Sequence, residues 1–316
     1  MTQNTTWNAL LAKAMVLGLA LCSLGSSGGQ RLELSGYLDA HGAISVQHQG
    51  DLVDPYFALQ ALLLADAHGL DTADPAAAWL RWLTPHYLAT GRLDRHCRQD
   101  RQWHACQRAD ADDASLALWL RFLHTVAEPG PQVRPSAMRA RRSLQALRDR
   151  HTGLYQVSPQ LPVHLLMDNL EVWSALPSPQ LAQAIQHHFW DPERQIYRVS
   201  TQANHPHPQN NFYPDATAQL YPLSVQFPLV PGGAAAHYRQ WMARYRSAWL
   251  SQMDTDFAWG LIALMAWTHR DLETVRCWQQ KALHLRHGQH WTITDEVVFQ
   301  IVPLLPRSLS TQEICT

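Results

Sequence analysis

The sequence predicts an all-α protein built as a toroid of six helical hairpins, an (α/α)6 fold, with a short β-hairpin in front of the first helix. Three observations predict this class. An aspartate followed by an apolar stretch recurs at intervals of roughly forty to sixty residues, the range of repeat architectures. Amphipathic stretches alternate with these copies. Apolar residues make up 46% of the 316 residues, which is enough for a large core and indicates one globular domain.

The first 29 residues are expected to be a signal peptide or an N-terminal anchor, followed by a single domain over residues 30–316. Lys13 provides a positive flank, residues 14–24 form an apolar run, and residues 23–29 offer small side chains for cleavage. The apolar run is short for a membrane-spanning helix. We therefore expect an exported protein, periplasmic or secreted, that contacts a membrane only if the N-terminal segment is kept as an anchor.

Residues 31–47 alternate polar and apolar side chains around Gly36 and Gly42, and this pattern predicts the short β-hairpin. The six inner helices are expected to begin at the recurring aspartates Asp54, Asp112, Asp168, Asp215, Asp254 and Asp295. Aspartate is a favoured helix cap, because its carboxylate accepts hydrogen bonds from the free amides of the first turn. The stretches that follow are apolar nearly all round, which is typical of helices enclosed on every side.

Five amphipathic stretches lie between the copies and are expected to form the outer helices. They are residues 75–88, 135–150, 178–190, 234–250 and 272–285. An inner ring of buried helices would then lie inside an outer ring, with the N-termini of the inner helices at one end. Since only five outer helices are evident, the sixth hairpin is either incomplete or closed by the N-terminal segment.

Four cysteines follow the expected signal, and their positions predict disulfide bonds in an oxidising compartment. Cys97 and Cys106 bracket a short polar stretch, which favours a bond that pins this loop. Cys277 could pair with Cys315, or it could be an ordinary buried thiol. Neither pair has the spacing of a zinc site, and we expect no metal and no other cofactor.

The charge balance disfavours nucleic acid as a partner. The chain has twenty-five Lys and Arg residues and twenty-six Asp and Glu residues, so the formal net charge is −1. A cluster of carboxyl groups at one end of the inner ring would instead suit glycosidic bond hydrolysis, in which one carboxyl donates a proton and another activates water or attacks the sugar. We therefore expect a polysaccharide or an oligosaccharide as substrate.

Two short motifs resemble those of the six-hairpin glycosidases, and most closely those of glycoside hydrolase family 8. The first is Asp110-Ala111-Asp112-Asp113 leading into Leu116-Ala117-Leu118, and the second is Tyr213-Pro214-Asp215-Ala216 leading into Leu220-Tyr221-Pro222-Leu223. The resemblance extends in architecture from about Asp51 to Pro303. It implies that Asp113 orients the sugar and that Asp215 is the base beside the attacking water.

The chain departs from that family at the general acid. The family has a glutamate at the first inner helix, where this chain has Asp54, and aspartate is one methylene shorter. Unsaturated-uronyl hydrolases of the same superfamily use aspartate, one of them in the second hairpin, so Asp113 could itself be the acid. A different glycosidase family and an inactive sugar-binding relative both stay open.

The motif Asp110-Ala111-Asp112-Asp113 is also similar to the proton donor of class II terpene cyclases. The expected export signal, the absence of Gln-Trp repeats and a length sufficient for only one barrel argue against this resemblance.

The candidate catalytic residues are Asp54, Asp113 and Asp215. The candidate substrate-binding residues are Tyr56, Trp103, Asp112, Asp168, Tyr213, Asp256 and Trp291, which lie near helix starts or in loops, where aromatic rings could stack on sugars. Helix capping alone would explain any single aspartate. The sequence thus predicts a glycoside hydrolase-like protein, with a non-catalytic glycan-binding or polysaccharide-assembly protein on the same scaffold as the alternative.

Overall fold

The computed structural model describes residues 29–127, 130–202, 212–306 and 315. Apart from Gly29, the expected signal or anchor lies outside this part of the chain. The described residues are mostly helical, with eleven α-helices and two small antiparallel sheets. None of these helices is both long enough and apolar enough to cross a membrane.

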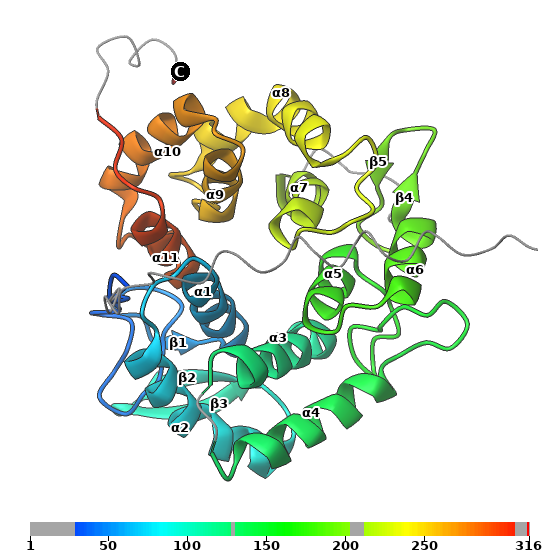
Figure 1. Cartoon of the computed structure of the whole chain (residues 1–316). Coiled ribbons are helices and arrows are strands. Elements are labelled where there is room, and N and C mark those ends of the chain that lie inside the picture. The colour runs from blue at the N-terminus through cyan, green and yellow to red at the C-terminus, as the bar shows by residue number, and fades with distance from the viewer. Residues whose placement is uncertain (1–28, 128–129, 203–211, 307–314, 316) are drawn as a thin grey trace, which may run out of the picture.

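The odd-numbered helices lie around the middle of the molecule in Figure 1, and the even-numbered helices lie outside them. The inner helices are α1 (Pro55–Ala67), α3 (Asp112–Thr125), α5 (Leu166–Ala175), α7 (Thr217–Ser224), α9 (Gly260–Thr268) and α11 (Ile293–Ile301). Each of them packs against the next inner helix along the chain, and α11 packs against α1. Every inner helix except α11 also packs against the outer helix that follows it.

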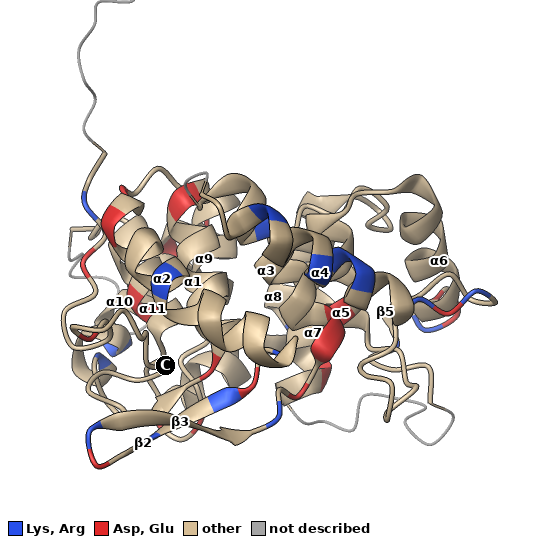
Figure 2. Ribbon diagram, turned by 90° about the horizontal axis from the view of Figure 1, so that it is seen from below, with Lys and Arg blue, Asp and Glu red and all other residues tan. Residues whose placement is uncertain are grey.

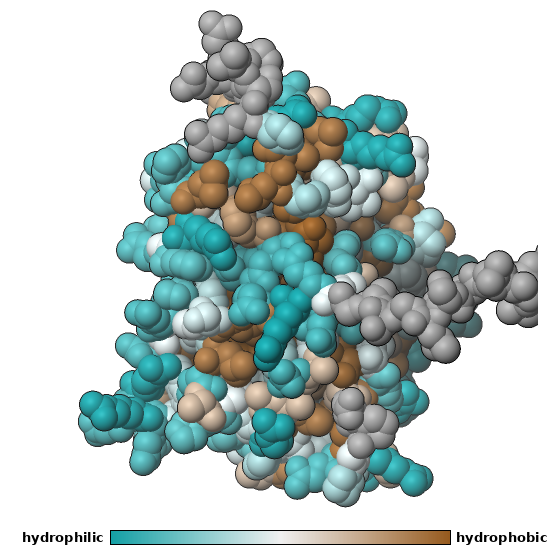
Figure 3. Space-filling model, turned by 60° about the vertical axis from the view of Figure 1, so that its left-hand side comes forward, coloured by the Kyte–Doolittle hydropathy of each residue, from teal (hydrophilic) through white to brown (hydrophobic). Residues whose placement is uncertain are grey.

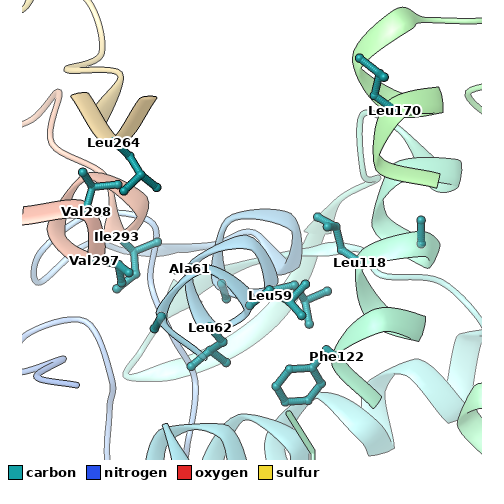
Figure 4. Packing of buried hydrophobic residues seen from close by; sticks show 14 of the residues in the cluster. Leu59, Ala61, Leu62, Leu118, Phe122, Leu170, Leu264, Ile293, Val297 and Val298 are labelled. Carbon is teal, nitrogen blue, oxygen red and sulfur yellow. The ribbon is translucent and has the colours of Figure 1, made fainter. Parts of the chain in front are cut away.

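The inner helices form most of the core because their residues are apolar on nearly every side. Leu59 and Leu62 of α1 lie between Phe122 of α3 and Val297 of α11 in Figure 4, and all four side chains are fully buried. Burying one such leucine stabilises the fold by about 1.5–3 kcal/mol. The apolar pattern of these helices therefore fixes which helices meet in the interior.

The five predicted outer helices are all present. They are α2 (Ala73–Thr90), α4 (Val133–Ala146), α6 (Pro179–Phe189), α8 (Ala234–Gln252) and α10 (Leu272–Leu285). Basic residues mark the outside of the bundle along α4 in Figure 2. On the face drawn in Figure 3, apolar residues form separate patches among hydrophilic ones.

The starts of four inner helices differ from the prediction, and one of them, α11, begins at Ile293, two residues before Asp295. Helix α9 begins at Gly260 rather than at Asp254, and the residue before it, Trp259, has φ = 50°, in the left-handed region. Helix α5 begins at Leu166, before Asp168, and α7 follows a kinked turn, η1 (Phe212–Ala216). The apolar residues Phe257, Ala258 and Trp259 precede Gly260, but the left-handed conformation of Trp259 keeps them out of the helix.

The expectation that aspartates cap the inner helices is right for only some of them. Asp54 caps α1, since its Oδ1 accepts a hydrogen bond from the amide of Tyr56 at 3.0 Å. Asp295 forms a capping box with Thr292 at the start of α11. No side chain caps α3, α5, α7 or α9. The aspartates at α3 and α5 are therefore not explained by capping.

The strands differ from the prediction. Within residues 31–47 only one isolated bridge forms, Leu38 to Ile44, instead of a hairpin, because the Asp39 carboxylate accepts from the amides of His41 and Ala43 and builds a tight turn. The ends of the segment bridge to other parts of the chain, Arg31 to Asp71 and Gln47 to Thr292. The hairpin lies instead in the connection between α2 and α3, as β2 (Arg95–Gln99) and β3 (Gln102–Gln107). Strand β1 (Leu52–Val53) pairs with β2, and β4 (Trp190–Asp191) pairs with β5 (Ile196–Tyr197).

The N-terminal segment lies beside α11, where a sixth outer helix would be expected. Glu33 and Gln300 exchange two hydrogen bonds, of 2.9 and 2.7 Å. The amide of Ile293 donates to the carbonyl of Val46 at 2.8 Å. Of the two arrangements that the sequence left open, the structure has the N-terminal segment against the last inner helix.

Both predicted cysteine pairs are present. Cys97 is paired with Cys106, and Cys277 with Cys315, each at disulfide-bonding distance. The first pair connects β2 to β3, and the second ties the C-terminal residues to α10.

Candidate functional site

The N-terminal ends of the six inner helices surround one cavity with a volume of about 400 Å³. Its charged and polar lining residues are Asp54, Tyr56, Gln60, Arg95, Asp110, Ser115, Asp168, Tyr213, Thr217, Tyr221, Ser224, Asp256, Thr292, Thr294 and Asp295. These residues come from segments far apart in the sequence. Of the predicted site residues, the cavity brings together Asp54, Asp168 and Asp256 with Tyr56 and Tyr213.

A cationic bridge joins two of the carboxylates on one side of the cavity. Arg95 donates from Nε to Oδ2 of Asp54 at 2.6 Å and from Nη2 to Oδ2 of Asp110. Strand β1 leads directly into Asp54, and its pairing with β2 places Arg95 alongside. Both oxygens of Asp54 accept hydrogen bonds, one from Arg95 and one from the Tyr56 amide, an arrangement that suits an ionised carboxylate.

Three further carboxyl groups of this region are buried, and no Lys or Arg pairs with them among the described residues. They are Asp113 of α3 and Asp168 and Glu171 of α5, exposed by 0%, 9% and 2%. Each has one oxygen that is buried without a hydrogen-bond partner. Burial disfavours the charged form of all three, and each carboxylate disfavours the charge on the others.

The pKa values of these groups follow from that setting. Burial raises the pKa of Asp168 to about 7, and the charge of Asp110 adds to the effect. Burial and the charge of Asp168 raise the pKa of Glu171 to about 8, against the lowering effect of its hydrogen bonds with two tyrosines. The pKa of Asp113 lies well above its ordinary value, first through burial and then through Asp168. Asp168 is the member of the group that lines the cavity.

A hydrogen-bonded network crosses the ring beside these carboxyl groups. Oε1 of Glu171 accepts from the hydroxyl of Tyr56 at 2.6 Å and from that of Tyr221. Gln60 donates to the same two hydroxyls at 3.3 and 3.2 Å and accepts from Thr294 at 3.2 Å. The network links α1, α5, α7 and α11 and holds the two tyrosine rings against the cavity.

Aromatic rings stand at the open side of the cavity. The ring of Tyr213 is stacked on Trp259, with centroids 5.1 Å apart and planes 19° from parallel. Tyr213 is 53% exposed, and the exposed ring of Phe257 meets Trp259 edge to face. Exposed, preformed stacks of this kind offer the flat apolar surface that sugar rings contact.

Five predicted site residues do not line this cavity. Asp112 faces a smaller hollow, where it pairs with Arg108 at 3.3 Å, and Asp113 lies behind the wall. Asp215 lies in the kinked turn before α7 and is half-buried. Trp103 donates to Asp39 at 2.7 Å on the hairpin. Trp291 is fully buried, donates to Glu296 and stacks on Trp278, so it belongs to the core.

Sequence reasoning missed several residues of the site. Glu171 follows Asp168 by three positions, so both lie on the same face of α5, and this spacing could have been noticed. Arg95 could not be found from sequence, because its place depends on the pairing of β1 with β2. Asp110 and Tyr221 belong to the two motifs that resemble the glycosidases, but the motifs did not indicate that either residue lines the cavity.

Among the described residues, no group of three or more His, Cys, Asp or Glu side chains has the arrangement of a metal site. Comparison with known proteins finds no matching family model, no matching curated protein and no matching solved structure.

Proposed function

We propose that the protein is a glycoside hydrolase that acts on a polysaccharide or an oligosaccharide within the cavity. One observation carries the proposal: Asp168, a carboxyl group whose burial raises its pKa to about 7, shares a cavity with the ion-paired carboxylates Asp54 and Asp110. Hydrolysis of a glycosidic bond needs a protonated carboxyl group and an ionised carboxylate in the same site.

In this proposal Asp168 is the general acid. Its surroundings favour the protonated form, and it lines the cavity, so its proton can reach a leaving oxygen. Asp54 was the expected acid, by its position at the first inner helix. Its hydrogen bonds with Arg95 and the Tyr56 amide fit the ionised partner better.

Asp54 and Asp110 are the candidates for the carboxylate that activates water. Asp110 is the more accessible, since its side chain is 79% exposed against 5% for Asp54. The stacked rings of Tyr213 and Trp259 would bind sugar next to these groups. Asp113 supports the site from behind, because a neutral buried carboxyl beside Asp168 avoids a second negative charge.

We further propose that the ring of inner helices is the (α/α)6 toroid of the six-hairpin glycosidases, closed by the N-terminal segment. The contact of α11 with α1 supports this arrangement. The two cysteine pairs are consistent with an oxidising compartment and support an exported protein.

The replacement Asp168→Asn tests the proposal. It removes the proton donor and keeps the shape, so we expect reducing-sugar release from a panel of glycans to fall by about 10²–10⁴-fold. The matched control is Asp74→Asn, an exposed aspartate paired with Arg31 far from the cavity, which should keep full activity. Full activity of Asp168→Asn would refute the assigned role.

A non-catalytic glycan-binding or polysaccharide-assembly protein is the second candidate. The observation that favours it is the Arg95 bridge, because it engages both carboxylates that would otherwise activate water. Titration calorimetry with oligosaccharides, combined with a product assay, separates the two: binding without product favours this candidate.

The terpene cyclase alternative gains no support, because Asp110, Asp112 and Asp113 lie in three different surroundings rather than forming one acid.

A further inference from the structure

The hairpin β2–β3 connects the disulfide of Cys97 and Cys106 to the carboxylate pair of the cavity. Arg95 begins β2, and its Nη1 donates to Oε1 of Gln107, which ends β3, at 3.3 Å. The disulfide lies between these residues and the hairpin tip. Asp110, the second partner of Arg95, follows Gln107 by three residues.

The two partners of Arg95 are held in different ways. Asp54 directly follows β1, and β1 pairs with β2, with Val53 opposite His96, so the chain on that side is fixed by the sheet and by the cap of α1. Asp110 lies in the short connection from β3 to α3, whose first residue, Asp112, donates from its amide to the carbonyl of Val157 at 2.8 Å.

Strand β3 contacts the rest of the protein mainly through Trp103, which donates to Asp39 at 2.7 Å and stacks under the guanidinium of Arg98. All residues of β3 except Trp103 are exposed. The register between β2 and β3 shifts between Arg95 and His96, at the arginine that binds Asp54 and Asp110. Strand β3 is the edge strand of a small three-stranded sheet, to which β1 contributes only two residues. The disulfide is a covalent link between β2 and β3 close to Arg95 and Gln107.

We propose that the Cys97–Cys106 disulfide is a positioning element of the site: it holds β3 against β2 so that Asp110 stays bound to Arg95 at the edge of the cavity, and its reduction releases Asp110. The effect on catalysis rests on the proposed function. The effect on the position of Asp110 does not.

Reduction by a dithiol is the chemical step. A thiolate of the reductant attacks one sulfur, and the Cys97–Cys106 bond breaks. The second thiolate of the reductant then closes its own disulfide, which leaves two protein thiols after protonation. Cys106 is exposed and Cys277 is fully buried, so mild reduction reaches the hairpin disulfide first.

The first measurement is amide hydrogen exchange of the folded protein, with and without dithiothreitol, and of the variant Cys97→Ser/Cys106→Ser. We expect exchange over residues 102–111 to become at least about tenfold faster, while residues 55–67 of α1 keep their protection. The matched control is Cys277→Ser/Cys315→Ser, which should leave residues 102–111 unchanged. Unchanged exchange there after loss of the hairpin disulfide would overturn the proposal, whether or not the protein cleaves glycans.

The second measurement separates positioning of Asp110 from general loosening. Asp110→Asn and the Cys97→Ser/Cys106→Ser variant should each lower kcat/KM by at least about tenfold, and the two changes together should lower it no further than Asp110→Asn alone, because both act through the same contact. Losses that multiply would contradict the proposal. If the serine variant does not fold, dithiothreitol treatment of the wild type and of Asp110→Asn replaces it, and reoxidation should restore only the wild type.

Discussion

Replacement of Glu171 by glutamine should stabilise the protein at neutral pH and not in acid. The carboxyl of Glu171 is 2% exposed, and burial with the neighbouring Asp168 raises its pKa from 4.5 to about 8. A carboxyl whose pKa is higher in the folded chain holds its proton there after the unfolded chain has lost it. The free energy of unfolding then falls as pH rises from 4.5 to 8.

The magnitude follows from that window. Each pH unit above 4.5 costs about 1.4 kcal/mol, so by pH 7 the wild type has lost about 3 kcal/mol relative to a side chain that does not titrate. Glutamine keeps an oxygen that accepts from Tyr56 and Tyr221. Its amide group takes the place of Oε2 of Glu171, which is itself buried without a hydrogen-bond partner. The cost of the unpaired N–H does not change with pH.

Urea unfolding of both proteins at several pH values from 4 to 8 measures the effect. We expect the difference between variant and wild type to shift by about 3 kcal/mol in favour of the variant between pH 4.5 and pH 7. A difference that stays constant over this range would show that Glu171 is ionised in the folded protein and would refute the reasoning.

Three further predictions test other parts of the structure. Asp215→Asn should keep hydrolysis within about threefold of wild type, since this side chain does not line the cavity, and a loss of 100-fold or more would restore the base role that the resemblance implied. Tyr213→Ala should weaken oligosaccharide binding about tenfold in titration calorimetry, because one stacking contact is lost, while the melting temperature stays constant since the ring is 53% exposed. Arg286→Ala should lower the free energy of unfolding by about 3 kcal/mol, because it removes the bidentate partner of Glu296, whose side chain is 3% exposed; a loss below about 1 kcal/mol in urea would contradict this.

The helices could be predicted from the sequence because their signals are local. The outer helix α10 (Leu272–Leu285) has the bounds that its amphipathic pattern and the preceding Asp271 indicate, and Asp271 does cap it. The start of α9 could not be predicted from Asp254, since the apolar run begins at Phe257 and nothing in it marks the left-handed conformation of Trp259 that delays the helix to Gly260. The strand pairing of β2 with β3 was missed because β3 has no buried face that a pattern could mark, since all of its residues except Trp103 are exposed.

The site was predictable only in its location. Recurring aspartates at helix starts indicated that carboxyl groups gather at one end of the ring, and Asp54, Asp168 and Asp256 line the cavity there. Their individual environments depend on partners from distant elements, such as Arg95 beside Asp54, and no spacing in the sequence encodes those contacts. Trp291 shows the same limit, because its place near a helix start did not reveal that it is enclosed by Trp278 and Phe299.

Titration of Asp168 in the free protein tests the account most directly. Carbon-13 chemical shifts of the side-chain carboxyls, followed from pH 3 to pH 9 and assigned by comparison with Asp168→Asn, would report its protonation without any substrate. The account predicts a midpoint near 7, set by burial and by the nearby charge of Asp110. A midpoint near 4, the value of an ordinary aspartate, would leave the cavity without a proton donor and would contradict the proposed chemistry.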